Sequence, residues 1–148
     1  MASKAVHYIS ISSRMNKIIT ERFALRGLLF GLVLLVVFHL LVLTGIIPFE
    51  IIWGGKITDV SQMRELETVS IIVSLFMLAV AAVWAKTNKT GTTGKVTTII
   101  LWIMFFFFCF NTITNLLSGN LFEQLFFAPL TLLLALFTFR VVKKPRRV

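Results

Sequence analysis

The stretch that decides the fold is "LLFGLVLLVVFHLLVL" at residues 28–43, which continues into "TGIIPFEIIWGGKI" at 44–57. Its first part is continuously apolar, with one histidine, His39. A strand of a membrane barrel alternates apolar and polar residues, so an unbroken run favours a transmembrane helix. Each residue of a helix adds about 1.5 Å, and about 20 residues cross the hydrocarbon core of a bilayer.

Three further apolar runs follow, so the chain is expected to cross a membrane four times. The expected spans are about 27–47, 68–85, 96–117 and 121–142, with an outer loop at 48–67. The 148 residues are 57% hydrophobic and 14% charged, a balance far from that of soluble domains. We therefore predict one integral membrane domain, an all-α four-helix bundle with up-down-up-down topology. A cleaved signal peptide is not expected, because no A-x-A-like site precedes Pro48.

The basic residues lie on one side of this arrangement. Five precede the first span, three lie between the second and third, and five lie at or beyond the end of the fourth, so this side holds thirteen of the fifteen lysines and arginines. By the positive-inside rule both termini are expected in the cytoplasm. The net charge of +9 thus indicates membrane topology and lipid head groups rather than nucleic acid.

The segment at 1–26 is expected to be cytoplasmic or interfacial. From Ser13 onward, Met15, Ile18, Ile19 and Phe23 recur at helical spacing, which predicts a short helix on the inner leaflet. The single cysteine, Cys109, cannot form an internal disulfide and is expected to be a buried structural thiol.

Small and polar residues predict which helix faces point inward. The first span has Gly27 and Gly31 in a GxxxG pair, a helix-packing motif. The other three spans each carry a stripe of such residues at helical spacing. These stripes are Glu67, Ser70, Ser74, Ala81 and Ala85; then Met104, Phe108, Asn111 and Asn115; then Gln124, Ala128, Thr131, Ala135 and Thr138.

Polar side chains in the spans concentrate near the predicted outer side. Polar groups inside a bilayer are costly and normally face partners or water. We therefore predict an outward-facing polar pocket. Its candidate ligand-binding residues are His39, Glu50, Trp53, Glu67, Ser70, Ser74, Asn111, Asn115, Glu123 and Gln124. The alternative interpretation is that these groups only hydrogen-bond between helices.

The loop "IIPFEIIWGG" is expected to lie back over the outer mouth. Pro48 should end the first helix, Trp53 should sit in the head-group zone with its N–H toward water, and Gly54 and Gly55 should permit a positive-φ bend. The loop would carry Glu50 toward the bundle, either as a lid or as an interfacial anchor. The segment "DVSQMRELETV" should enter the second span as a helix.

The segments "FHLLVLTGIIPFEIIWGGKI" at 38–57, "MRELETVSIIVSLFML" at 63–78 and "FNTITNLLSGNLFEQLFFAPLTLLLAL" at 110–136, with the basic tail, resemble a set of small uncharacterised bacterial four-span membrane proteins. The resemblance implies four spans and the cytoplasmic membrane of a bacterium, and it transfers no activity. Sterol-isomerase-like four-span proteins are similar only in mixing histidine, glutamate and tryptophan.

Three functions remain open from the sequence. The first is binding or moving a small amphiphilic ligand or ion, with His39 and Glu50 or Glu67 responding to pH. The second is a structural or accessory subunit. The third is an intramembrane enzyme using His39 with Glu50, Glu67 or Glu123, for which no catalytic motif is present. No metal or cofactor is expected. Expected partners are membrane lipids, that ligand, and a second copy, through the GxxxG face, or another membrane protein.

Overall fold

The computed structural model describes residues 20–90 and 94–143. Its helices are α2 (Glu21–Leu43), α3 (Val60–Thr90), α4 (Lys95–Leu116) and α5 (Ala128–Val142). Two 3-10 turns, η1 (Phe49–Ile51) and η2 (Trp53–Gly55), lie in the loop after α2, and a π-helical segment, η3 (Glu123–Phe127), leads into α5. The predicted interfacial helix at the N-terminus lies outside the described residues.

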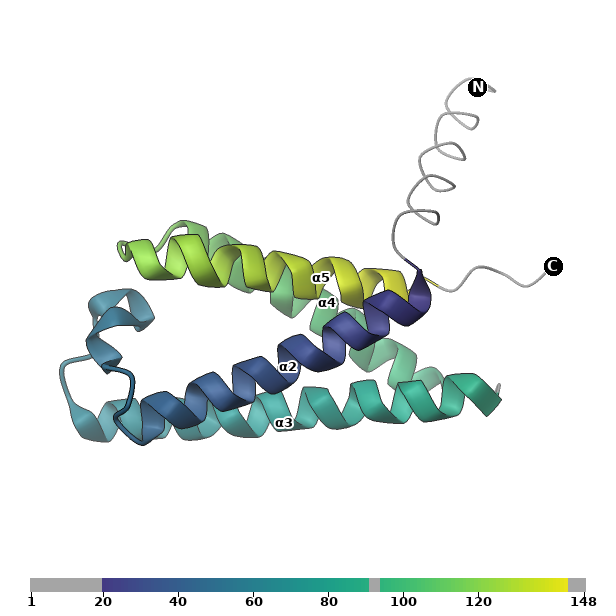
Figure 1. Ribbon diagram of the computed structural model, residues 1–148, viewed down its shortest axis with the longest axis horizontal. Coiled ribbons are helices and arrows are strands. Elements are labelled where there is room, and N and C mark those ends of the chain that lie inside the picture. Colours follow the sequence, from purple (N-terminus) through teal and green to yellow (C-terminus); the bar gives the residue numbers. More distant parts are fainter. Residues whose placement is uncertain (1–19, 91–93, 144–148) are drawn as a thin grey trace, which may run out of the picture.

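The four long helices confirm the predicted helical spans. In the described part of the chain, Glu21–Leu43, Val60–Asn88, Lys95–Leu116 and Glu123–Val142 are each long and apolar enough to cross a membrane. Successive helices run in opposite directions (Figure 1). We call the end with residues 44–59 and 117–122 the loop end, and the opposite end, with Glu21 and Val142, the terminal end.

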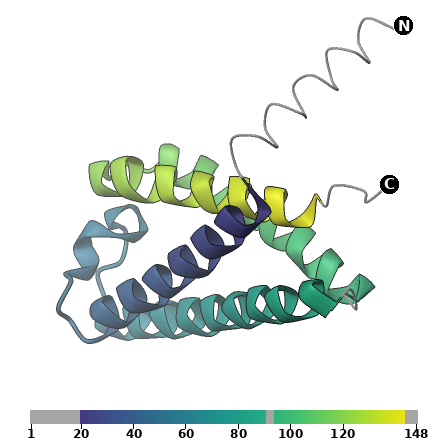
Figure 2. The same ribbon diagram turned by 45° about the vertical axis from the view of Figure 1, so that its right-hand side comes forward.

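The helices form two hairpins that diverge toward the loop end. One hairpin pairs α2 with α3 and the other pairs α4 with α5, and α2 also crosses α5. Figures 1 and 2 show the hairpins meeting near the terminal end and separating toward the other, where the loop carrying η1 and η2 lies between them. The fold thus resembles a wedge whose wide side is partly filled by this loop.

Two apolar clusters follow from this shape. The main core occupies the narrow part and includes the fully buried Leu28, Trp84 and Leu101. A smaller cluster lies under the loop and consists of Val42, Ile52, Ile57 and Met63. The predicted inward stripes are confirmed, because each of their members is buried or partly buried.

The GxxxG face of α2 packs against α5. A Cβ placed on Gly27 would lie 2.5 Å from Phe137 Cε2, and one placed on Gly31 would lie 2.6 Å from Leu134 Cδ2. The glycines therefore allow a close approach of α2 to α5, as the packing motif predicts. Helix α5 thus occupies this face within the chain.

Gly45, rather than Pro48, ends the first helix. The backbone of Gly45 has φ +77°, its N–H donates to Val42 O at 2.9 Å, and Ile46 N–H donates to Leu41 O at 2.9 Å. This is a Schellman cap, which needs a left-handed residue directly after the helix. The helix consequently stops four residues before the predicted end, and Pro48 is instead the N-cap residue of η1.

Gly45→Ala is expected to lower the free energy of unfolding by about 1 kcal/mol, since an L-residue is strained at this φ. Nothing lies within 4 Å of the added Cβ, so the cost is purely conformational. Gly94→Ala is the matched control, because Gly94 has φ −71° and the same open surroundings. Equal stability of the two variants in bicelles would contradict the role of the cap.

Helix α3 begins at a side-chain cap. Asp59 Oδ2 accepts the Gln62 N–H at 3.3 Å and so caps α3. Helix α3 therefore starts at Val60 and projects beyond the apolar span predicted from residue 68. At the terminal end, the Asn88 amide donates to the Glu21 carboxylate and joins α3 to α2.

Candidate functional site: a cavity closed by the 44–59 loop

A cavity of about 390 Å³ lies between the two hairpins at the wide side of the wedge. Residues of both apolar clusters line it: Leu35, Met77 and Phe108 from the main core, and Ile52 from the cluster under the loop. The cavity therefore lies between the two clusters. Its polar lining consists of His39, Trp53, Ser70, Ser74, Asn111, Asn115, Glu123 and Thr131.

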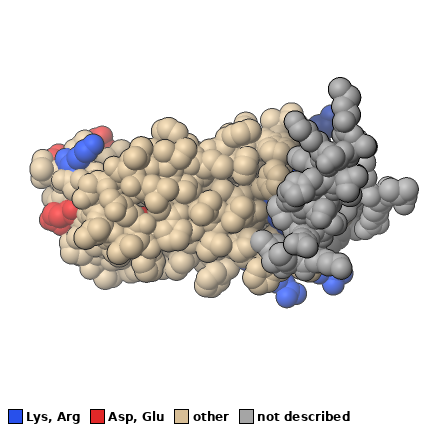
Figure 3. Space-filling view, turned by 90° about the horizontal axis from the view of Figure 1, so that it is seen from above, with Lys and Arg blue, Asp and Glu red and all other residues tan. Residues whose placement is uncertain are grey.

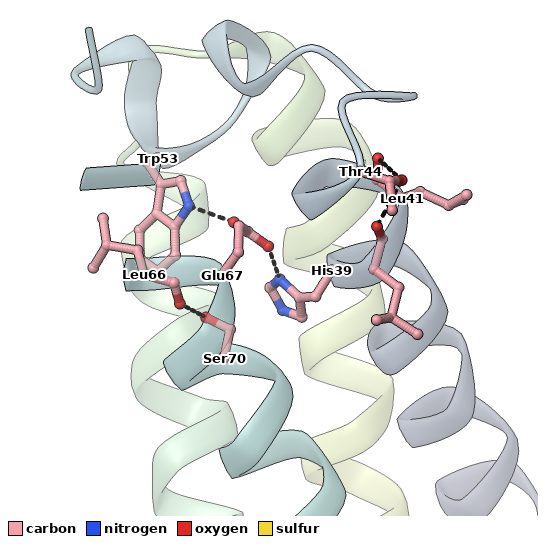
Figure 4. Close-up of polar contacts among 8 residues, drawn as sticks. His39, Leu41, Thr44, Trp53, Leu66, Glu67 and Ser70 are labelled. Atoms are coloured by element: carbon pink, nitrogen blue, oxygen red, sulfur yellow. Dashed lines mark hydrogen bonds and ion pairs between the residues drawn. The ribbon is translucent and has the colours of Figure 1, made fainter. Parts of the chain in front are cut away.

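Glu67 is the centre of the first polar contact group. Its carboxylate is completely buried, with Oε2 lying 2.7 Å from His39 Nδ1 and Oε1 accepting the Trp53 indole N–H at 2.9 Å. Figure 4 shows the carboxylate between the two rings. One side chain of α3 thereby holds both α2 and the loop, and it fixes the orientation of an imidazole that lines the cavity.

Glu123 is the centre of the second contact group. Its two oxygens lie 3.0 and 3.1 Å from the Gly54 N–H, and the Ser118 hydroxyl donates to Oε2. The Asn120 N–H donates to Ser118 Oγ at 3.1 Å, which holds that hydroxyl in place. The carboxylate is 8% exposed and belongs to the cavity wall.

A π-helical turn places Glu123 at the start of the last helix. The Ala128 N–H donates to Glu123 O, five residues back. Pro129 follows directly. Because proline has no backbone N–H, it cannot donate a hydrogen bond to the carbonyl four residues earlier. Single π turns of this kind are frequent at functional sites, since they change the direction of one side chain relative to the helix.

The tip of the loop bridges the two hairpins. The Trp53 indole N–H donates a hydrogen bond to Glu67 of α3. The backbone N–H of the next residue, Gly54, donates to Glu123, which precedes α5. Trp53 has φ +56°, and Gly54 and Gly55 both have φ +68°. A left-handed conformation is unusual for a bulky residue and persists only where its surroundings impose it. The carboxylate contacts supply that constraint.

The remaining predicted polar residues divide into two groups. Ser70 donates to Leu66 O at 2.8 Å and Asn111 donates to Phe107 O at 2.8 Å, so each bonds within its own helix while lining the cavity. Ser74 is buried in the wall. Asn115 lines the cavity near the loop end, and its amide makes no hydrogen bond to the described residues.

Three predictions about the site are wrong. Glu50 is exposed and does not line the cavity, because η1 directs it outward. Gln124 also lies outside the wall, where its amide donates to Ser118 O across the turn. The Trp53 N–H turns inward to Glu67 rather than toward water, since a buried carboxylate acceptor was available there.

Sequence patterns did not reveal several residues of the site. Phe38 and Phe127 form an edge-to-face pair with ring centroids 4.7 Å apart, and both line the cavity. Their sequence signal is that of any apolar helix residue. Ser118 gave no signal beyond its place in the tight "SGN" turn. For the π turn, the one local sequence signal is Pro129, near the start of the span, and it does not specify a π turn by itself.

The arrangement is suited to binding through hydrogen bonds and apolar contact. Within residues 20–90 and 94–143, no group of three or more His, Cys, Asp or Glu side chains is arranged to hold a metal ion. The His39–Glu67 pair is a carboxylate-oriented imidazole, which is one component of acid–base chemistry.

No family model, curated protein or solved structure matches this chain.

Proposed function

We propose that this chain is an integral membrane protein that binds a small amphiphilic ligand in the loop-end cavity. The observation that carries the proposal is the cavity itself. Its volume of about 390 Å³ falls in the range of about 300–1,000 Å³ typical of small-molecule sites, and its wall is mostly apolar with a few convergent polar groups.

We propose that the protein is oriented in the membrane as the positive-inside rule predicts. A broad, nearly uncharged surface separates the charged ends on the face drawn in Figure 3. The bias of lysine and arginine in the sequence toward the terminal end would place both termini in the cytoplasm and the cavity in the outer half of the membrane. The resemblance drawn from the sequence supports the cytoplasmic membrane of a bacterium.

The loop at 44–59 would act as the lid of this site. It contributes Ile52 and Trp53 to the wall, and hydrogen bonds to Glu67 and Glu123 hold it in place. Two adjacent residues of its tip, Trp53 and Gly54, make these hydrogen bonds. This favours a lid over a simple interfacial anchor.

The test uses a neutral probe, decanol carrying a diazirine on its chain, in nanodiscs of zwitterionic lipid. Photolabelling of the cavity wall is expected to saturate with probe concentration, whereas labelling of lipid-facing residues is not. Ser74→Phe fills the cavity with a ring and is expected to reduce saturable labelling about tenfold, equivalent to about 1.4 kcal/mol of binding. Mass spectrometry of peptides locates the label.

Leu75→Phe is the matched control. Leu75 is the neighbouring residue on α3 and is 48% exposed on the outer, lipid-facing surface, so the same ring is added away from the cavity. It is expected to leave saturable labelling intact. Equal labelling of both variants, or labelling that never saturates in the unmodified protein, would reject the proposed function.

A further inference from the structure

We infer that the ligand of this cavity is a cationic amphiphile that enters from the side, between α3 and α4. The inference rests on the proposed function and adds the charge of the head group and the route of entry. It follows from three features of the wall: its charges, the position of its aromatic rings and the exposure of its edge.

The charges that face the cavity favour a cation. Glu123 belongs to the wall, and the buried Glu67 lies directly behind His39 and Trp53. No lysine or arginine is among the residues lining the cavity. This group of side chains is therefore acidic in composition, with two carboxyl groups and one imidazole. In a low-dielectric site such a group attracts a cationic head and repels an anionic one.

Glu123 retains the capacity to accept further hydrogen bonds. A carboxylate offers about four acceptor positions, and the contacts of the Gly54 N–H with both oxygens and of the Ser118 hydroxyl with Oε2 use three of them. The Asn115 amide, with no hydrogen bond to the described residues, lines the same cavity. An ammonium head has three donors, so these two side chains supply acceptors that it needs.

Aromatic rings accompany these acceptors. Phe38, Trp53 and Phe127 line the cavity together with His39 and Glu123. The face of an aromatic ring attracts a cation, and the attraction grows when the cation is shielded from water. The same ring face repels an anionic head.

The edge of the cavity opens toward the lipid. Three of its lining residues are exposed on the surface, with Val69 on α3 58% exposed and Phe107 and Phe110 on α4 43% and 66% exposed. These helices belong to different hairpins and diverge toward the loop end (Figure 1). An alkyl chain in the membrane can therefore reach Met77 and Phe108, deeper in the wall, without crossing water.

The test compares three diazirine probes with the same decyl chain: decylammonium, decanol and decyl sulfonate. Labelling in zwitterionic nanodiscs is expected to saturate at about tenfold lower concentration for decylammonium than for decanol, a difference of about 1.4 kcal/mol. Decyl sulfonate is expected to label least. Label from decylammonium is expected on peptides containing Val69 and Phe107, at the lateral opening.

Two variants and one control test the role of Glu123. Glu123→Gln retains one acceptor oxygen for Gly54 but removes the carboxylate, and it is expected to abolish most of the preference for decylammonium over decanol. Asn115→Asp adds a charge and is expected to increase that preference. Glu65→Gln removes an exposed acid from the loop end of α3 and is expected to leave the preference unchanged.

The outcomes separate the two proposals. Saturable labelling by decanol without any preference for decylammonium would overturn the inference on charge and leave the binding function standing. A preference lost equally in Glu65→Gln and Glu123→Gln would also overturn it, because surface charge would then account for the effect. Absence of saturable labelling by any probe would reject the binding function itself.

Discussion

Glu67→Leu is expected to lower the free energy of unfolding by about 3 kcal/mol. The carboxylate accepts the Trp53 N–H and contacts His39 Nδ1 while completely buried. Hydrogen bonds to charged groups contribute about 1.5–3 kcal/mol, and removing a shared acceptor leaves two polar groups without a partner. Steric trapping in bicelles measures the change for a protein that remains in a membrane-like environment.

The same variant is expected to release the loop. Ile52 is 4% exposed in the cluster under the loop, so in a Cys109→Ser background a cysteine introduced as Ile52→Cys should react slowly with a membrane-impermeant maleimide. Adding Glu67→Leu is expected to raise the rate about tenfold or more, since exposure of the site would then follow local opening. Reagent added to intact cells also reports the side of the membrane on which the loop lies.

Two control variants test whether the effect is specific to the buried carboxylate of Glu67. Glu65→Leu makes the same change two residues earlier on an exposed position of α3 and is expected to have no measurable effect on either readout. Glu67→Gln keeps one acceptor oxygen and should lie between the two leucine variants. A Glu67→Leu protein as stable and as protected as Glu65→Leu would show that the buried carboxylate does not hold the loop.

Gly31→Val is expected to cost about 2 kcal/mol of unfolding free energy, because it forces side chains into a packed interface. The added Cβ alone would lie 2.6 Å from Leu134 Cδ2, closer than van der Waals contact permits. Helices α2 and α5 would have to separate or Leu134 would have to leave its rotamer. Because α2 and α5 join the two hairpins, the change acts on their docking.

A double variant distinguishes this clash from a general effect of valine in a helix. Leu134→Ala removes the atom that meets the new Cβ, so its combination with Gly31→Val is expected to be more stable than the sum of the single changes predicts. Gly119→Val makes the same substitution where nothing lies within 4 Å and is expected to be tolerated. Additive losses in the double variant would contradict direct contact.

Local sequence patterns were sufficient for the class of fold and for the inward faces of its helices. Long apolar runs determine four helices that are able to span a membrane, and this was confirmed. The stripe from Glu67 through Ser74 to Ala81 lies on the buried side of α3 as its spacing predicts. Such features depend on the helical period, which is a local property of the chain.

The assembly of the site depended on contacts between distant parts of the chain. The sequence suggested that Glu67 and Glu123 lie near the same side, but not that adjacent loop residues bond to each of them. It also placed Glu50 inward, although a short 3-10 turn directs it outward. Side-chain direction in a loop follows from a few backbone angles that helical periodicity does not constrain.

The sequence by itself thus determined that the chain forms apolar helices and which stripe of each helix is buried, because both follow from composition repeated at a fixed period. Only the tertiary structure decided how the hairpins diverge, where the cavity lies and which carboxylate holds which loop residue. These depend on the close packing of Gly27 and Gly31 against α5 and on the left-handed backbone at Trp53 and Gly54. Both are consequences of contacts between segments far apart in the chain.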